Sequence, residues 1–169
     1  VPTSDWLPLL REIADRSDAI ARRLFQRVDL RVEVKPDRSL VSEADREIES
    51  AARALVAERR PELGVFGEEQ GEQAGRSSAR LIIDPIDATA NFVRGIPVFA
   101  TLLAIEIDAE VVAGLVSAPA LGTRWHAARG QGAWQGERRL RVSGVRQLAD
   151  AQLFHGSLGG YEGARTPPG

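Results

Sequence analysis

The chain has 169 residues, with 22 Lys and Arg side chains against 24 Asp and Glu side chains, for a net charge of −2. This balance excludes an overall basic surface for nucleic acid or an anionic membrane, and no apolar run is long enough to span a membrane. Cysteine is absent, which excludes disulfides, thiol nucleophiles and thiolate metal sites and favours a cytoplasmic location. The hydrophobic content of 43% predicts one globular domain with a sizeable core.

Two amphipathic helices are predicted first along the chain. Apolar residues recur at helical spacing from Ser4 to about Arg27, and again from Ser42 until Pro61 ends the second helix. Residues 28–34 between them form a short strand or an extended link. Ser42 followed by Asp45 is typical of a capping box, which gives Asp45 a purely structural interpretation.

The next two apolar runs each end in carboxylates. The first run, 65–66, precedes Gly67, Glu68 and Glu69, and the second, 81–83, precedes Asp84, Pro85, Ile86 and Asp87. We expect both runs to be strands, the second of them central and buried on both faces. We also expect it to stop at the acids, because Pro85 has no N–H for a ladder. The polar segment 70–79 predicts a mobile surface loop.

Four carboxylates at the ends of two strands require an explanation. Two carboxylates about 4 Å apart repel by roughly 4 kcal/mol at an effective dielectric constant near 20. Neither motif contains Lys or Arg, so the cluster must be solvated apart, protonated or bridged by a cation. Oxygen-only ligands select hard ions, which favours Mg²⁺. The alternative is that Asp84 and Asp87 form a turn and cap the next helix.

A helix that starts after Asp87 would direct the backbone N–H groups of Ala88 and Thr89 at a phosphate. Metal and phosphate side by side are what metal-assisted phosphomonoester hydrolysis requires, because the cation neutralises the phosphoryl oxygens and activates water. The Thr89 hydroxyl and Glu68 are candidates to orient that water. A threonine in a first helical turn is equally typical of a local hydrogen bond.

From Phe99 onward the pattern predicts an antiparallel meander. Strands are expected at 99–107, 111–117, 124–128 and 140–142, with turns at 108–109 and near Gly122. Because helices precede strands rather than alternating with them, the chain predicts an α+β fold with layered helices on a largely antiparallel sheet. We expect this domain to cover residues 1–158, followed by a Gly/Pro-rich tail at 159–169.

The two acid motifs in this order, with Ala127, Gly130, Gly132 and Ala133, resemble the inositol monophosphatase family of Mg²⁺-dependent, lithium-sensitive phosphatases. The resemblance covers nearly the whole chain and implies the N-terminal half of the inositol monophosphatase-like sugar phosphatase fold. It implies that Glu68, Asp84, the Ile86 carbonyl and Asp87 bind metal, that Asp45, Thr89 and Glu68 assist the attacking water, and that Glu68, Asp87, Ala88 and Thr89 hold substrate. Lys35 also matches in order and context.

Within the family, segments 91–97 and 117–125 are most similar to bacterial histidinol-phosphate phosphatases. That similarity implies a small phosphorylated metabolite, L-histidinol phosphate, as substrate, and a role in histidine biosynthesis. Inositol monophosphates, bisphosphorylated nucleotides and fructose bisphosphate are alternative substrates with the same mechanism.

Two features depart from the family pattern. The family has Gly where this chain has Ala88, and a Cβ there crowds the approach of backbone to phosphate. Family members also continue into a second α/β half that supplies another metal-binding Asp, and no Trp-Asp motif follows Asp87 in this sequence. We therefore expect a homodimer or dependence on a missing C-terminal half. The alternative is a non-catalytic metal-binding or oligomerisation module.

Overall fold

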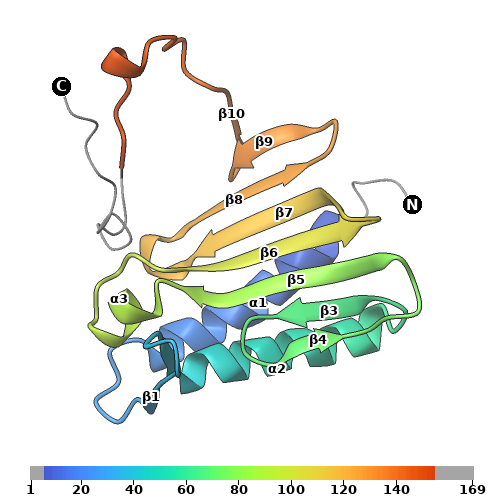
Figure 1. Cartoon of the computed structure of the whole chain (residues 1–169), viewed down its shortest axis with the longest axis vertical. Coiled ribbons are helices and arrows are strands. Elements are labelled where there is room, and N and C mark those ends of the chain that lie inside the picture. Colours follow the sequence, from blue (N-terminus) through green and yellow to red (C-terminus); the bar gives the residue numbers. More distant parts are fainter. Residues whose placement is uncertain (1–5, 155–169) are drawn as a thin grey trace, which may run out of the picture.

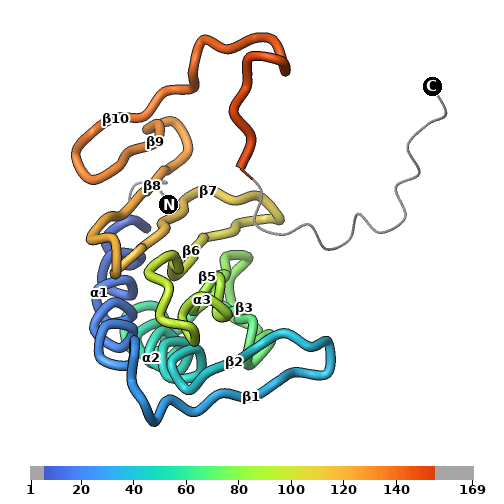
Figure 2. Tube along the Cα trace, turned by 90° about the vertical axis from the view of Figure 1, so that its left-hand side faces the viewer, coloured from blue at the N-terminus to red at the C-terminus, as the bar shows by residue number. Residues whose placement is uncertain are grey.

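A computed structural model describes residues 6–154 of the chain. Two long helices, α1 (Leu7–Leu24) and α2 (Glu43–Arg59), pack against each other and cover one face of a sheet (Figures 1 and 2). Between them, β1 (Val32–Val34) and β2 (Leu40–Ser42) form a small antiparallel hairpin. The predicted α+β architecture is confirmed, while the predicted tail at 159–169 lies outside the described residues.

In the described part of the chain the main sheet has eight strands in the order β10-β9-β8-β7-β6-β5-β3-β4. The strands are β3 (Gly64–Gly67), β4 (Gly71–Gln73), β5 (Ala79–Asp87), β6 (Ala100–Ile107), β7 (Glu110–Ala118), β8 (Thr123–Ala128), β9 (Gly132–Gln135) and β10 (Arg138–Leu140). A short helix, α3 (Thr89–Val93), separates β5 from β6. Neighbouring strands are antiparallel except for β3 and β5, which are parallel.

The prediction that the second acid-bearing strand stops before Pro85 is wrong, because β5 continues to Asp87. The register against β6 shifts between Asp84 and Asp87, so that Pro85 and Ile86 face a single residue, Thr101. Such a bulge removes the need for a ladder N–H at the proline. The Thr101 hydroxyl instead donates to the Pro85 carbonyl oxygen at 2.8 Å.

Strands of only three or four residues account for the other differences. The segment predicted to be a mobile loop contains β4, which pairs with β3. Strands β2 and β9 were not predicted, and β10 lies at 138–140 instead of 140–142, with Val142 97% exposed. Strands of three or four residues carry too few alternating positions to be detected from sequence alone.

The core lies between the two helices and the sheet. Leu10, Ile13, Ile48 and Leu55 of the helices meet alternate residues of the central strands, among them Leu81, Ile83 and Ile105. Because side chains alternate along a strand, Ile82 and Asp84 of β5 face away from the helices and are only half buried. The prediction that this strand is covered on both faces is therefore wrong for residues 6–154.

The sheet face turned away from α1 and α2, here called the open face, is largely apolar. Two rows of half-buried residues cross this face, and each row consists of register partners on neighbouring strands. The first row is Ile82, Ala104, Gly114, Ala127, Ala133 and Leu140. The second row, beside it, is Asp84, Leu102, Val116, Trp125 and Gln135. Asp84 thus lies at the end of a row of apolar side chains. None of the helices in 6–154 covers these rows.

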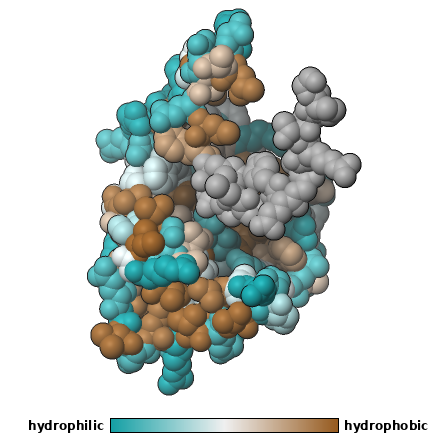
Figure 3. Space-filling view, turned by 60° about the vertical axis from the view of Figure 1, so that its left-hand side comes forward, coloured by the Kyte–Doolittle hydropathy of each residue, from teal (hydrophilic) through white to brown (hydrophobic). Residues whose placement is uncertain are grey.

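Some large apolar side chains also reach the surface away from the sheet. Val34 of β1 and Val98, which precedes β6, are both mainly exposed. Figure 3 shows apolar surface gathered at the lower end of the molecule, where Figure 1 places β1. Over the described residues, no helix combines the length and the apolar character needed to cross a membrane.

Candidate active site

The parallel pairing of β3 with β5 brings the two acid motifs together. Gly67 is the register partner of Ile83, so both strands deliver their following residues to the same edge. The backbone N–H of Glu68 continues this pairing by donating to the Ile83 carbonyl oxygen at 3.2 Å. The carboxylates of Glu68, Asp84 and Asp87 therefore lie close enough to influence one another.

Asp84 shows this influence most clearly. Burial, then the charges of Glu68 and Asp87, and finally that of Asp45 raise the pKa of the Asp84 carboxyl to about 7. Its Oδ1 atom is buried and has no hydrogen-bond partner among the described residues. A buried carboxylate oxygen without a donor is costly, and a bound cation would remove that cost.

Lys35, on the loop between β1 and β2, supplies the positively charged side chain that neither acid motif contains. Its Nζ donates to Glu68 Oε1 at 3.0 Å and to Glu69 Oε1 at 2.6 Å. Burial lowers the pKa of Lys35, but the hydrogen bonds that Lys35 donates to Glu69 and Glu68, with the charges of these carboxylates, outweigh burial and raise it overall. Burial of Glu69, whose side chain is 7% exposed, raises the pKa of that carboxyl despite Lys35. Part of the predicted repulsion is thus neutralised within the chain.

Asp45 caps α2 and also contacts the segment that follows β5. Its Oδ2 accepts the Ser42 N–H at 2.8 Å and the Ser42 hydroxyl at 2.6 Å, so the predicted capping box is confirmed. Its Oδ1 lies 3.2 Å from the Thr89 hydroxyl, which also lies 2.9 Å from the Ile86 carbonyl oxygen. Burial raises the pKa of Asp45 against the opposing effect of the Ser42 hydrogen bonds. The capping carboxylate therefore also reaches the predicted phosphate side of the site.

Ala88 joins β5 to α3 in the left-handed conformation, with φ 66° and ψ 46°. A Cβ in this region clashes with the following carbonyl, and glycine avoids the clash. The structure therefore gives a conformational reason for the glycine that the resemblance implies at this position. The crowding of phosphate by Cβ, which the sequence suggested, stays a prediction.

We expect Ala88→Gly to raise the free energy of unfolding by about 1 kcal/mol, because it relieves left-handed strain at one residue. Ala88→Val, which adds a β-branched side chain at the same backbone angles, should lower it by at least a similar amount. Urea unfolding of the three proteins measures both effects. A less stable Gly variant would contradict the assigned strain.

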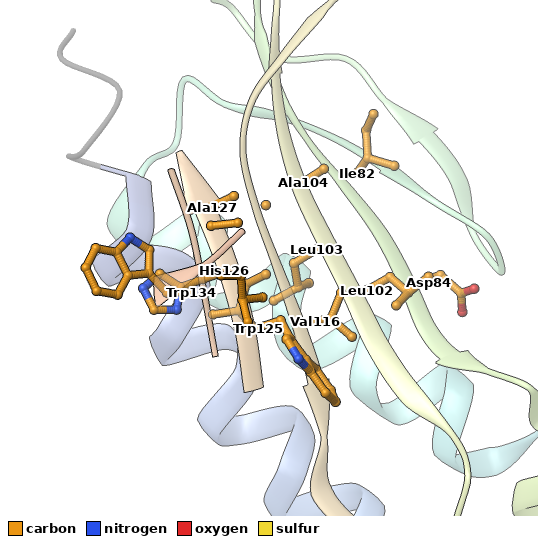
Figure 4. A pocket seen from close by; sticks show the side chains of 14 residues that line it. Ile82, Asp84, Leu102, Leu103, Ala104, Val116, Trp125, His126, Ala127 and Trp134 are labelled. Atoms are coloured by element: carbon orange, nitrogen blue, oxygen red, sulfur yellow. The ribbon is translucent and has the colours of Figure 1, made fainter. Parts of the chain in front are cut away.

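A groove of about 460 Å³ lies on the open face and ends at Asp84. Apart from Asp84, apolar side chains dominate its lining, including Ile82, Leu102, Val116 and Trp125. Figure 4 shows Asp84 on one side of the groove and the Trp125 ring farther across the sheet. The acid cluster and the open face are therefore parts of one continuous surface.

The oxygen ligands at this edge of the sheet fit a hard cation that also binds water and phosphate. Within 6–154, no group of three or more His, Asp or Glu side chains is close enough together to hold a metal ion by itself. The available donors are carboxylate oxygens and the Ile86 carbonyl, with Asp84 Oδ1 unpartnered. Mg²⁺ accepts this combination, since it usually keeps several waters and binds one or two carboxylates plus a phosphate.

Comparison with known proteins identifies the family. Residues 4–165 match the model of the inositol monophosphatase family. The chain belongs to that family. Histidinol-phosphatases of Mycobacterium tuberculosis and Streptomyces coelicolor are each 46% identical to it, over 162 and 167 residues, which are 93% and 94% of this chain and 62% of each relative. The extragenic suppressor protein SuhB from Bartonella henselae, a crystal structure, matches with a TM-score of 0.80 and 35% identity over 84% of this chain and 56% of that one.

The chain therefore spans less than two thirds of the length of these family relatives. The matched part includes both acid motifs and the whole described sheet. More than a third of each histidinol-phosphatase has no counterpart in this sequence.

Two residues that contact the acid motifs were not predicted from the sequence. Glu49 and Arg53 of α2 hold the backbone that follows β3. Their signal was present, because Glu49 falls on the apolar face of its helix and Arg53 follows at the i+4 position. A charged residue on a buried helix face requires a specific partner.

Proposed function

We propose that the chain provides the metal- and phosphate-binding part of a Mg²⁺-dependent phosphomonoesterase that acts on L-histidinol phosphate in histidine biosynthesis. The unpartnered, buried oxygen of Asp84 among neighbouring carboxylates carries the metal assignment. The 46% identity to two histidinol-phosphatases supports the substrate. Inositol 1-phosphate is the alternative substrate, given the family. The absence of cysteine supports a cytoplasmic location.

In this proposal Glu68, Asp84, the Ile86 carbonyl and Asp87 would hold Mg²⁺ together with water and phosphate oxygens. The bound ion would neutralise phosphoryl oxygens and lower the pKa of water. The backbone N–H groups of Ala88 and Thr89, in the turn that follows β5, hold the phosphate.

Thr89 and Asp45 form the proton path of the proposed mechanism. The Thr89 hydroxyl accepts a hydrogen bond from the attacking water and donates its own proton toward Asp45 Oδ1, 3.2 Å away. Asp45 is held for this role by Ser42, which occupies its other oxygen. No protein nucleophile takes part.

Release of inorganic phosphate from L-histidinol phosphate, with and without Mg²⁺, tests the proposal. Inositol 1-phosphate is measured alongside, and Asp84→Asn serves as the inactive control. Release that requires Mg²⁺ and is lost in the variant supports the mechanism, and the faster substrate identifies the branch. Release retained by Asp84→Asn would contradict the metal assignment. Mg²⁺ binding without release from either substrate would favour the non-catalytic module.

We further propose that the open face contacts the polypeptide that the relatives have beyond the matched part. Its apolar rows and the groove of about 460 Å³ give a contiguous apolar surface, which soluble proteins rarely leave uncovered. This proposal is supported by the chain's coverage of only 62% of each relative, because the relatives have further polypeptide outside the matched part. Because Asp84 lies at the end of one row, a partner seated there would border the acid cluster.

Mixing the purified chain with the part of the M. tuberculosis relative that this chain does not match tests this contact. We expect a one-to-one complex by sedimentation, a fall in the fluorescence of an apolar dye, and faster phosphate release. Trp125→Asp should prevent complex formation. Self-association that persists in the presence of the added polypeptide would instead assign the open face to a homodimer.

A further inference from the structure

Glu49 of α2 has a carboxylate that the proposed chemistry does not use. Its side chain is 0% exposed and lies on the same helix face as the core residues Ile48 and Ala52. Burying an ionised carboxylate is expensive unless charge and hydrogen bonds compensate it. The compensating partners are therefore informative.

Those partners belong to the segment 67–71, which we call the acid turn because it carries Glu68 and Glu69. Glu49 Oε2 accepts the N–H of Glu69 at 2.8 Å, and Oε1 accepts the N–H of Gln70 at 3.1 Å. Two main-chain N–H groups in succession thus bind one side chain from another element. Backbone groups held in this way fix the orientation of the side chains that they carry.

Arg53, one helical turn later, completes the anchor. Its Nε and Nη2 donate to Glu49 Oε1 at 3.0 and 2.7 Å, and Nη2 also donates to the Gly71 carbonyl oxygen at 2.6 Å. The pair clamps the end of the acid turn as well as its middle. Because the guanidinium neutralises the Glu49 carboxylate, the anchor adds no net charge beside the acid cluster.

Gly67 provides the space that this anchor needs. A Cβ at Gly67 would lie 2.1 Å from Glu49 Oε1 and 2.3 Å from its carboxyl carbon. The backbone of Gly67 is not in the left-handed region, so glycine is required here for space and not for conformation. Gly67 and Glu49 are thus complementary parts of one contact.

We propose that Glu49 is a positioning residue which, with Arg53, fixes the acid turn so that Glu68 lies beside Asp84 where the metal binds. Glu49 acts through the N–H groups of Glu69 and Gln70 and does not itself reach the ion. This inference rests on the proposed function, because it assigns Glu49 to the same metal site.

The experiment compares wild-type protein with Glu49→Gln, which keeps the size of the side chain but removes its charge. Mn²⁺ serves as the probe, its dissociation constant is measured by electron paramagnetic resonance, and amide hydrogen exchange is followed at Glu69 and Gln70. We expect affinity for Mn²⁺ to fall by about tenfold or more, as is usual when a group that supports a metal ligand is changed. Exchange at both amides should accelerate.

Asp18→Asn is the matched control, since Asp18 is also a buried carboxylate paired with an arginine. It contacts Ser117 and Arg124, on β7 and β8, which are three and four strands away from β3 in the sheet. Both variants should lower the thermal midpoint by roughly 5 to 10 °C, because each breaks a buried ion pair. Only Glu49→Gln should weaken Mn²⁺ binding.

A second test keeps the inference falsifiable if Glu49→Gln folds poorly. Gly67→Ala should also weaken Mn²⁺ binding, because its Cβ displaces the carboxylate. In the Glu49→Ala background, where that carboxylate is gone, Gly67→Ala should add little further loss, so the two changes should be clearly non-additive. Additive effects, or Mn²⁺ affinity within twofold of wild type in Glu49→Gln, would overturn the positioning role alone. Failure of the wild-type protein to bind Mn²⁺ would overturn both this role and the proposed function.

Discussion

Asp84→Asn is expected to stabilise the metal-free protein while it abolishes metal binding. At pH 8 and with a chelator present, the free energy of unfolding should rise by roughly 2 kcal/mol. A pKa raised from its ordinary value of 3.8 to about 7 corresponds to about 4 kcal/mol, and we halve this figure because the side chain is partly solvated. Opposite effects on stability and on metal binding are characteristic of a residue that is retained for function.

The physical reason lies in the contacts of the Asp84 carboxylate. Its Oδ1 is buried without a hydrogen-bond donor, and the charges of Glu68, Asp87 and Asp45 favour the protonated form of the Asp84 carboxyl. Two carboxylates can share a hydrogen bond only if one of them is protonated, whereas an asparagine amide can donate to Glu68 at any pH. The variant therefore relieves both the repulsion and the unsatisfied oxygen.

The pH dependence gives a second readout of the same substitution. Because the folded-state pKa of Asp84 is raised, the folded chain binds this proton more tightly than the unfolded chain does. Its contribution to stability is therefore fully present below about pH 4 and is lost as the pH rises to about 7. The stability difference between Asp84→Asn and wild type should grow over this interval and level off above it.

Urea unfolding of both proteins from pH 4 to pH 8, with and without Mg²⁺, measures these effects. Mg²⁺ should stabilise the wild type and leave the variant unchanged, since only ligands bound to the folded state raise stability. Glu106→Gln is a suitable control, because that carboxylate pairs with Arg80 on β5 away from the acid cluster. A variant that is less stable than wild type without metal would show that Asp84 is not electrostatically strained.

The features predicted correctly from sequence are those that local chemistry determines. The capping box at Ser42 and Asp45 needs only a spacing of three residues, and each acid-bearing strand is an apolar run next to its own carboxylates. Adjacency of the two motifs followed from their common design and is confirmed by the parallel pairing of β3 with β5.

The features that were missed depend on contacts between distant segments. Continuation of β5 through Pro85 depends on a bulge against β6, and neutralisation of Glu68 depends on Lys35, which lies 33 residues earlier. The position of Glu49 on the apolar face of its helix indicates a partner, but the sequence does not say which one, because its partners include the N–H groups of another element. Residue type alone does not reveal a partner that is main chain.

Phe92→Ala is expected to be among the most damaging single substitutions in the described chain. It should lower the free energy of unfolding by about 3 to 5 kcal/mol, the usual cost of deleting a buried aromatic ring. Phe92 is fully buried and packs against Phe25 at 5.5 Å and Phe99 at 4.8 Å between ring centroids. Since domains are commonly stable by only about 5 to 15 kcal/mol, this loss is a large fraction of the total.

The consequences should extend to the site because Phe92 is the buried residue of α3. Its N–H donates to the Ala88 carbonyl oxygen at 3.2 Å, and Thr89 lies one helical turn before it. The three rings thus fix the turn that presents the Thr89 hydroxyl to Asp45. Removing one ring should weaken binding of inorganic phosphate more than binding of Mn²⁺, because the proposed metal ligands lie on β5 and in the acid turn after β3.

Phe154→Ala provides the matched control, because Phe154 is 84% exposed and the same atoms are deleted. We expect it to change stability by less than about 0.5 kcal/mol. Urea unfolding measures both variants, and titrations with phosphate and Mn²⁺ below the unfolding transition separate the two ligands. Equal weakening of both ligands in Phe92→Ala would indicate that α3 and the strand ends loosen together, so that the aromatic cluster supports the whole edge of the sheet and not the phosphate side alone.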